Sequence, residues 1–320
     1  MGMTIKNNMS EKKLISVVTP CWNEELNVEE LYNQVKTIFA ELPQYRYEHI
    51  FIDNASTDNT VAILKKLAVA DYNVKIIVNI KNFGHIRSPY YGLLQAHGDA
   101  VVLIVSDLQD PPVMIKEFLQ KWEEGNAIVV GVKTQSEENP LMFSIRKVYY
   151  NLIKRISDVE QIKNFTGFGL YDQKFIAVLR TLKDPYPYFR GLITEVGFNR
   201  VEINYIQPAR KKGKTSNNFY SLYDLAMLGF VNHSKIPLRL ASFIGFGMSV
   251  VSFIVGIVYL VYKLLFWDRF EAGLAPLTIG IFLFSSIQLF FIGILGEYIG
   301  AIYTQVRERP LVIEKERVNF

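Results

Sequence analysis

The segment LASFIGFGMSVVSFIVGIVYLVY runs from Leu240 to Tyr262, contains no charged residue, and lies between Arg239 and Lys263. A second uncharged segment runs from Ala272 to Gly296. Each is longer than the roughly 20 apolar residues that a helix needs to cross the hydrocarbon core of a bilayer. A short connection separates them, so together they predict a transmembrane helical hairpin near the C-terminus.

The residues before the hairpin are typical of a soluble α/β domain. Met1 to Lys13 is polar, and the apolar run Leu14–Pro20 is too short for a signal peptide, so we expect none. Basic residues flanking the hairpin outnumber those in its connection, which places both termini in the cytoplasm. We expect a cytosolic α/β domain (1–218), an interfacial amphipathic helix (219–235), two transmembrane helices within 236–304 (about 240–263 and 273–300), and a cytosolic basic tail (305–320).

The composition of the whole chain limits the classes of function. Of the 320 residues, 50% are hydrophobic, which the two apolar segments explain, and the formal net charge is only +4. A charge this small does not indicate nucleic-acid binding. Cys21 is the only cysteine, so no internal disulfide can form, and we expect it to be a small buried residue. The four histidines lack metal-ligand spacing and are interpreted as structural.

Short apolar runs alternate with helical patterns through the α/β domain. Strands are predicted over Leu14–Pro20, Tyr47–Asp53, Val74–Val78, Ala100–Val105, Ala127–Val132, Phe168–Tyr171 and, at an edge, Arg200–Tyr205. Helices are predicted up to about Ala40, after Asp58, over Ser88–His97, from Pro111 to about Glu124, and over Asn139–Ile156. This alternation predicts a mostly parallel sheet, and such sheets bind ligands at the carboxyl ends of their strands. Polar residues follow the predicted strands there, at Asn23-Glu24, Asp53, Asn82, Asp107 and Lys133.

The segment Asp53-Asn54-Ala55-Ser56 follows the second predicted strand. Its carboxylate is suited to accept hydrogen bonds from a uracil ring or a ribose. Clusters of Asp, Asn and Ser are also ordinary turns and helix caps, and this turn interpretation is the stronger of the two from these residues alone.

The segment Asp107-Leu108-Gln109-Asp110-Pro111-Pro112 leaves a strand that should be buried on both faces. A carboxylate at Asp107 and an amide oxygen at Gln109 are suited to hold Mg²⁺ or Mn²⁺ against a diphosphate, because hard ions take oxygen ligands. The alternative is a helix start with Asp110 as the N-cap and Pro111 at the first helical position. The two interpretations are compatible.

Two features lie just before the first apolar segment. The basic loop Arg210-Lys211-Lys212-Gly213-Lys214 either clamps phosphates or is attracted to anionic lipid, and both are compatible. Residues 219–234 predict a helix with a single charge, Asp224. We expect this helix to lie at the bilayer surface, and the alternative is that it packs on the soluble domain.

Taken together, these segments resemble glycosyltransferase family 2. The matching segments are Ser16–Glu25, Phe51–Asp58, Asn82-Phe83-Gly84, Asp107–Pro112, Tyr188-Phe189-Arg190-Gly191 and Pro237–Leu240 before the two spans. The resemblance is to the branch that transfers sugars to polyisoprenyl phosphates, which includes dolichol-phosphate mannose synthases and, closer, bactoprenol glucosyltransferases. It covers nearly the whole chain.

The resemblance implies a GT-A fold and a nucleotide-sugar donor. It implies a nucleotide-sugar site made of Pro20, Asn23, Glu24, Asp53, Ser56, Asn82 and Asp107. It implies that Asp107 and Gln109 bind Mg²⁺ or Mn²⁺. It also implies that phosphate or the acceptor is bound by Lys133, Arg190, Arg210 and Lys214. Asp107, Lys133 and Arg210 would be the catalytic set. The implied reaction is inverting transfer of a hexose, foremost glucose from UDP-glucose, to undecaprenyl phosphate at the cytoplasmic face of a bacterial inner membrane. The product would be a lipid-linked sugar donor for cell-envelope glycans such as O-antigen.

The chain departs from the family pattern at three places. Val105 stands where the family's metal motif usually has its first acid, Gly167 and Gly169 stand where relatives often have an acid and an arginine, and Thr215-Ser216 stands where relatives often have Ser-Lys.

Mannose or an amino-arabinose remain alternatives to glucose. A membrane-anchored protein that binds nucleotide sugars without catalysis is a second alternative. A processive polysaccharide synthase and a flippase are disfavoured, because two spans per chain do not form a channel. Glycines in both spans permit close helix packing, so a homo-oligomer is a further expectation.

Overall fold

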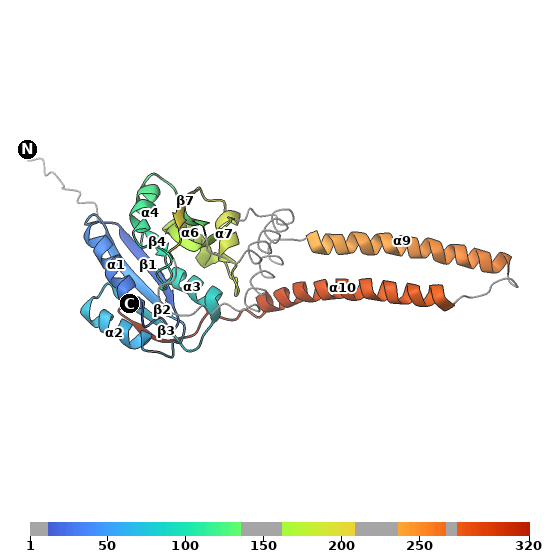
Figure 1. The fold of residues 1–320 in the computed structure, drawn as a ribbon, viewed down its shortest axis with the longest axis horizontal. Coiled ribbons are helices and arrows are strands. Elements are labelled where there is room, and N and C mark those ends of the chain that lie inside the picture. The colour runs from blue at the N-terminus through green and yellow to red at the C-terminus, as the bar shows by residue number, and fades with distance from the viewer. Residues whose placement is uncertain (1–11, 136–161, 209–235, 267–273) are drawn as a thin grey trace, which may run out of the picture.

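A computed structural model of the chain describes residues 12–135, 162–208, 236–266 and 274–320. The predicted helices over Asn139–Ile156 and 219–235, the basic loop with Arg210 and Lys214, and the connection between the apolar segments lie outside these residues. In the described part, an α/β domain is followed by two long helices and a short returning segment (Figure 1).

One eight-stranded sheet forms the centre of the α/β domain, in the order β7-β5-β6-β4-β1-β2-β3-β8. The strands are β1 (Leu14–Cys21), β2 (Arg46–Asp53), β3 (Val74–Asn79), β4 (Ala100–Leu103), β5 (Ile128–Gln135), β6 (Phe165–Asp172), β7 (Arg200–Ile206) and β8 (Glu314–Val318). β1 pairs in parallel with both β2 and β4, and β2 pairs in parallel with β3. β6 and β8 run antiparallel to their neighbours. The predicted mostly parallel sheet is therefore confirmed, and β7 lies at the predicted edge.

Helices cover both faces of the sheet. They are α1 (Val28–Ala40), α2 (Thr60–Ala70), α3 (Gly84–Gln95), α4 (Met114–Glu123), α6 (Gln173–Thr181) and α7 (Phe189–Glu195). Apolar residues of α1 and α4 pack with one set of strand residues, and those of α3, α6 and α7 pack with another. Along β1, Ile15 and Val17 belong to the first cluster and Val18 to the second. Both faces of β1 are therefore buried, which explains its continuous apolar run.

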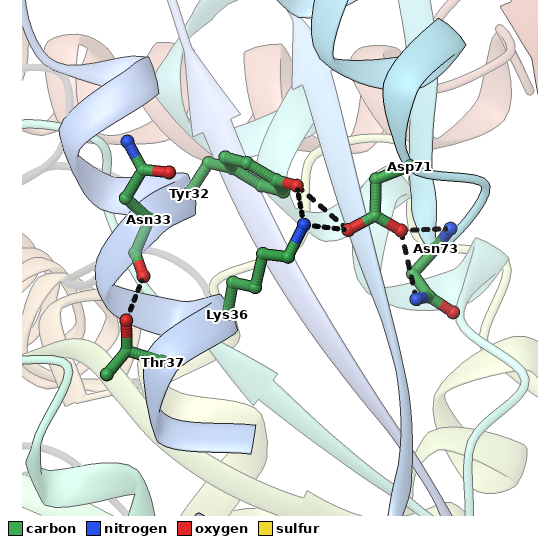
Figure 2. Close-up of polar contacts among 6 residues, drawn as sticks. All are labelled: Tyr32, Asn33, Lys36, Thr37, Asp71 and Asn73. Atoms are coloured by element: carbon green, nitrogen blue, oxygen red, sulfur yellow. Dashed lines mark hydrogen bonds and ion pairs between the residues drawn. The ribbon is translucent and has the colours of Figure 1, made fainter. Parts of the chain in front are cut away.

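A polar cluster joins α1 to the turn that precedes β3. The Tyr32 hydroxyl donates to Asp71 Oδ2 at 2.8 Å, and Lys36 Nζ lies 3.2 Å from the same oxygen (Figure 2). Asp71 Oδ1 accepts from the Asn73 N–H at 3.0 Å, which closes the turn. This cluster lies at the amino ends of the parallel strands, which we call the amino edge of the sheet. It fixes the position of α1 there.

The C-terminal residues complete the sheet instead of forming only a tail. Glu314–Val318 pairs as β8 with β3, and Lys65 Nζ of α2 lies 2.6 Å from Glu316 Oε2. Asn319 Nδ2 donates to the carbonyls of Ala68 and Val74 at 2.8 and 2.9 Å. The predicted division, which ended the α/β domain at residue 218, did not include this strand.

The two apolar segments form α9 (Ile236–Leu265) and α10 (Leu274–Val306), which lie side by side (Figure 1). Leu238–Val258 and Gly280–Val306 are long and apolar enough to cross a membrane, and no part of either is buried inside the protein. Large apolar side chains such as Phe243, 75% exposed, and Phe282, 72% exposed, point outward. An exposed apolar surface of this length indicates a membrane or a partner around the helices.

Candidate active site

Most of the predicted site residues lie at the carboxyl ends of the parallel strands, which we call the carboxyl edge of the sheet. β1, β2, β3 and β4 are parallel, so their carboxyl ends meet at this edge. Cys21, the last residue of β1, is in register with Asp53, the last residue of β2. The loop with Asp107 follows β4 at the same edge. The structure therefore brings together loops that are far apart in the sequence.

The loops after β1 and β2 bind each other. The Asn23 N–H donates to Ser56 Oγ at 2.9 Å, and the Thr57 N–H donates to Asn23 Oδ1 at 2.8 Å. The Glu24 N–H donates to Thr60 Oγ1 at 2.9 Å. The nucleotide-sugar candidates at these strand ends and loops are Pro20, Asn23, Glu24, Asp53 and Ser56. They form one connected structure, with Asn23 exposed and Glu24 buried.

Asp53 closes the turn after β2. Its side chain is fully buried, Oδ2 accepts from the Ser56 N–H at 3.0 Å, and Oδ1 accepts from the Ser56 hydroxyl. Burial raises the pKa of Asp53 above its ordinary value, and the bonds from Ser56 lower it only in part. The turn interpretation is confirmed by these contacts. A contact between Asp53 and a nucleoside stays a prediction.

Asn82 lies on the third loop, between β3 and α3. Its Oδ1 accepts from Asn54 Nδ2 at 2.9 Å and from the Gly84 N–H at 2.8 Å. Asn54 Oδ1 in turn accepts from the Phe83 N–H at 2.8 Å. Gly84 has a φ of +86°, a conformation that favours glycine. These contacts fix the loop immediately before His85.

Asp107 and Gln109 lie on the loop that follows β4. Both side chains are partly exposed, and Asp107 Oδ1 accepts from the Gln109 N–H at 3.2 Å. They supply one carboxylate and one amide oxygen. Among the described residues, no group of three or more His, Cys, Asp or Glu side chains could hold a metal ion. Magnesium sites usually use one or two carboxylates together with substrate phosphates and water. Asp107 and Gln109 therefore fit a Mg²⁺ or Mn²⁺ ion that a diphosphate completes.

Three of the six described non-glycine residues with positive φ lie in the same loops. Asn23, Ala55 and Leu108, which follow β1, β2 and β4, have positive φ values of 55°, 62° and 59°. For a residue with a Cβ, this left-handed conformation costs about 1–2 kcal/mol. Strained residues of this kind cluster at binding and catalytic sites, where the surrounding structure holds them. The strain supports this edge of the sheet as the functional site.

Asp110 has a role that the sequence did not reveal. It is only 2% exposed, and Oδ1 accepts from the Tyr205 hydroxyl at 2.8 Å. Burial raises its pKa to about 6, while the Tyr205 hydrogen bond and the Lys133 charge act in the opposite direction. Helix α4 begins at Met114 without a side-chain cap. The prediction of Asp110 as the N-cap is therefore wrong, because its carboxylate binds Tyr205 of β7 instead.

The phosphate candidates divide into two pairs. Lys133 lies on β5, near enough to Asp110 for its charge to lower the pKa of that carboxyl. Arg190, in the first turn of α7, lines a cavity of about 130 Å³. Arg210 and Lys214 lie outside the described residues. The structure thus places Lys133 and Arg190 at the carboxyl edge, and the roles of all four stay predictions.

The cavity beside Arg190 opens between α3, β4, β6 and α7. Its lining includes Pro20, His85, Pro89, Tyr90, Leu103, Val105, Asp110, Thr166, Gly167, Tyr188 and Arg190. Val105, which stands at the position of the family's first acid, thus faces the cavity with an apolar side chain. His85 was interpreted as structural, yet it is exposed and lines the cavity. Its place directly after Asn82-Phe83-Gly84 was the signal that could have identified it.

Comparison with known proteins identifies the family of the chain. The sequence model of glycosyl transferase family 2 matches residues 16–178. An uncharacterized glycosyltransferase, YkcC, from Bacillus subtilis (strain 168) is 35% identical over 95% of this chain and 94% of its own length. A prophage-derived bactoprenol glucosyl transferase from Shigella flexneri is 32% identical over 94% of this chain and 97% of its own length. A prophage bactoprenol glucosyl transferase homolog from Escherichia coli (strain K12) is 32% identical, with 94% and 98% covered.

The family description includes β1 to β5 and the loops with Asp53 and Asp107, and the relatives extend the similarity through α9 and α10. The resemblance seen in the sequence is confirmed, as is the GT-A type of α/β fold that it implied. This chain belongs to glycosyltransferase family 2.

Proposed function

We propose that this glycosyltransferase transfers a hexose, foremost glucose from UDP-glucose, to a polyisoprenyl phosphate such as undecaprenyl phosphate. One observation carries the proposal. Similarity to the bactoprenol glucosyl transferase of Shigella flexneri extends over 94% of this chain, so it includes both the site loops and the two apolar helices. A water-soluble acceptor would not explain two helices that are apolar and long enough to cross a membrane, whereas a lipid acceptor does.

The donor would bind across the loops after β1, β2 and β3. The Asn23 N–H donates to Ser56 Oγ and Asn23 Oδ1 accepts from the Thr57 N–H, so little of this surface would have to be ordered when a nucleotide binds. Asn82 extends the same wall beside the second loop. The nucleoside would lie on this wall and its diphosphate would point toward Asp107.

Asp107 and Gln109 would hold a Mg²⁺ or Mn²⁺ ion together with the donor diphosphate. The bound ion would supply positive charge to the leaving diphosphate. Lys133, Arg190, Arg210 and Lys214 would bind the remaining phosphate oxygens of the donor or of the acceptor. These residues would stabilise charge and position the reactants, which are the largest contributions to many transfers of this kind.

The acceptor chemistry needs no general base. A lipid phosphate is already an anion at neutral pH, whereas a sugar hydroxyl must lose a proton when it attacks. A phosphate oxygen would form the new bond to the anomeric carbon while the bond from that carbon to the donor diphosphate breaks. The nucleoside diphosphate would leave with the electron pair. Attack from the opposite side inverts the configuration at the anomeric carbon.

A transfer assay on the purified full-length protein in detergent tests the proposal. Radiolabelled UDP-glucose, GDP-mannose and UDP-GlcNAc would be offered separately with undecaprenyl phosphate, with and without Mg²⁺ or Mn²⁺. We expect label from UDP-glucose to enter the lipid phase and to be lost on chelation. Transfer from another donor would correct the sugar. Nucleotide binding without transfer from any donor would overturn the enzymatic assignment in favour of a membrane-anchored binding protein.

A further inference from the structure

The segment after α10 crosses α3 before it reaches the sheet. Residues 307–313 join α10 to β8, and Figure 1 shows this segment running back along the α/β domain toward the C-terminus. The Pro310 carbonyl accepts a hydrogen bond from Arg87 Nη2 of α3. Leu311 packs on the apolar cluster of α3, α6 and α7, and Val312 is buried. We call residues 307–313 the return segment.

The return segment keeps the end of α10 close to α3. Val306, the last residue of α10, precedes Pro310 by four residues, which span at most about 14 Å when fully extended. The Ile313 carbonyl accepts from the Ile80 N–H at 3.0 Å, so the segment is also fixed at its far end. Movement of α10 relative to α3 is therefore limited by a short, doubly attached stretch of chain.

Arg87 joins this segment to two parts of the active-site wall. Its guanidinium lies 5.3 Å from the centre of the Phe83 ring, in the loop with Asn82. On its own helix, His85 precedes Arg87 by two positions and lines the cavity. A single side chain thus contacts the return segment and the β3–α3 loop, on the helix whose residue His85 lines the cavity.

The end of α10 and the cavity also share a wall. Tyr188 lines the active-site cavity and, on its other side, a second cavity of about 320 Å³. Gln305, in the last turn of α10, lines that second cavity. The apolar helix therefore ends next to a cavity that shares Tyr188 with the active-site cavity.

We propose that Arg87 is a positioning residue that holds the active-site cavity in place relative to the end of α10, so that a phosphate at the membrane surface meets the donor sugar. This inference rests on the proposed function, because it takes the acceptor to be a lipid held in the bilayer. Arg87 touches none of the reacting groups. Without it, a smaller fraction of molecules would be aligned with the bilayer at any time. The apparent affinity for a membrane-bound acceptor falls in proportion to that fraction.

Two variants of Arg87 and one control would be compared as full-length proteins in lipid nanodiscs. Arg87→Met keeps a long unbranched stem and removes the guanidinium with its hydrogen-bond donors, and Arg87→Lys keeps the charge. Lys65→Met removes the pair with Glu316 on β8, away from the cavity. Each would be assayed with undecaprenyl phosphate in the bilayer and with citronellyl phosphate, a short isoprenoid phosphate dissolved in water.

Arg87→Met should raise the KM for undecaprenyl phosphate about tenfold, the scale expected for loss of a charged hydrogen bond. Its kcat, its KM for the nucleotide sugar and its KM for citronellyl phosphate should stay unchanged. Arg87→Lys should restore part of the loss, and Lys65→Met should behave as the wild type. An equal loss with both acceptors, or an unchanged KM for undecaprenyl phosphate, would overturn the proposal.

Amide hydrogen exchange provides a readout that does not depend on turnover. In Arg87→Met, the amides of the return segment and of Ile80 should exchange faster, while those of the central strand β1 should not change. Unchanged exchange in the return segment would overturn the positioning role even if transfer were impaired. If the wild type transferred no sugar to either acceptor, the proposed function would fail, and the role of Arg87 in lipid transfer would fail with it, whatever the exchange showed.

Discussion

Two carboxylates at the amino edge of the sheet, Glu48 and Asp71, have lowered pKa values, whereas two at the carboxyl edge, Asp53 and Asp110, have raised ones. Burial tends to raise the pKa of all four groups compared here. At the amino edge, hydrogen bonds from Lys75 and Ser16 to Glu48, and from Tyr32 and Lys36 to Asp71, outweigh burial and hold both pKa values below the ordinary range (Figure 2). At the carboxyl edge, the donors around Asp53 and Asp110 do not outweigh burial, and both pKa values are raised.

The two carboxyls with raised pKa values lie beside the site loops, where the pKa of Asp58, by contrast, is lowered. A carboxylate with a lowered pKa has its charge satisfied by the folded chain, so it stabilises the fold at neutral pH. A carboxylate with a raised pKa carries an electrostatic cost that the chain alone does not offset, and such groups are frequent at functional sites. The carboxyl edge also contains the strained loops, and this coincidence supports the site independently of any relative.

The largest expected effect is on turnover at the carboxyl edge. Asp107→Asn should lower kcat about 100-fold or more, because the variant loses the carboxylate proposed to hold the metal ion at the leaving diphosphate. Its melting temperature should stay within about 2 °C of the wild type, since the side chain is partly exposed. Transfer assays and thermal unfolding would measure the two effects.

Asp71→Asn is the matched control at the amino edge. It should show the reverse pattern, a lower melting temperature with kcat retained, because Asp71 binds Tyr32 and Lys36 and lies far from the site loops. If Asp107→Asn kept full turnover with unchanged metal dependence, the assignment of Asp107 would be wrong.

A smaller effect, on stability alone, is expected from Glu48→Gln. Glu48 is 4% exposed; Oε2 lies 2.6 Å from Lys75 Nζ, and Oε1 accepts from Ser16 Oγ and from the His97 N–H. Removing its charge leaves Lys75 without its partner, which should cost about 3 kcal/mol at pH 7. Chemical unfolding would measure the loss. Glu316→Gln, which breaks the exposed pair with Lys65, should cost less than about 1 kcal/mol.

The stabilisation by Glu48 should depend on pH in a definite direction. The folded pKa of Glu48 lies below its unfolded value, so its contribution is present above about pH 4.5 and is lost as the pH falls through the folded pKa. The difference between wild type and Glu48→Gln should therefore shrink in acid. A difference that stayed constant down to pH 3 would contradict the ion-pair account of the amino edge.

The parts of the fold that the sequence revealed are those with a local signal. β4 is an unbroken apolar run, β1 to β3 are largely buried and rich in apolar residues, and the uncharged lengths of α9 and α10 were visible directly. The site loops were predictable because polar residues follow those strands. β6 is longer than predicted, since Thr166 and Gly167 interrupt its apolar pattern.

The rest depends on contacts between distant residues. β8 has the sequence Glu-Lys-Glu-Arg-Val, which is typical of an exposed tail, and it becomes a strand only because β3 offers a free edge and Lys65 offers a charge partner. Asp110 was predicted as a helix cap because Tyr205, 95 residues away, does not influence any local pattern. The role of Arg87 likewise required Pro310 to be placed beside α3.

A change in stability smaller than that of Glu48→Gln is expected at the carboxyl edge. The folded pKa of Asp110 is raised to about 6, above its ordinary value of 3.8. Between these values the folded state holds a proton that the unfolded state has lost, so this group makes the wild type less stable as the pH rises. Asp110→Asn keeps an oxygen to accept from the Tyr205 hydroxyl and removes the buried charge. It should match the wild type near pH 4 and be more stable by about 1–2 kcal/mol at pH 7, measured by unfolding at both pH values.

Tyr205→Phe sharpens the same test, because it removes the donor that lowers the pKa of Asp110. In Tyr205→Phe, the fall in stability with rising pH should therefore occur at a higher pH than in the wild type. If Asp110→Asn were instead less stable than the wild type at pH 7, the Lys133 charge would have to outweigh the burial of Asp110. The carboxyl edge would then be electrostatically satisfied like the amino edge. Only the strained loops and the cavity beside Arg190 would remain to distinguish the two edges.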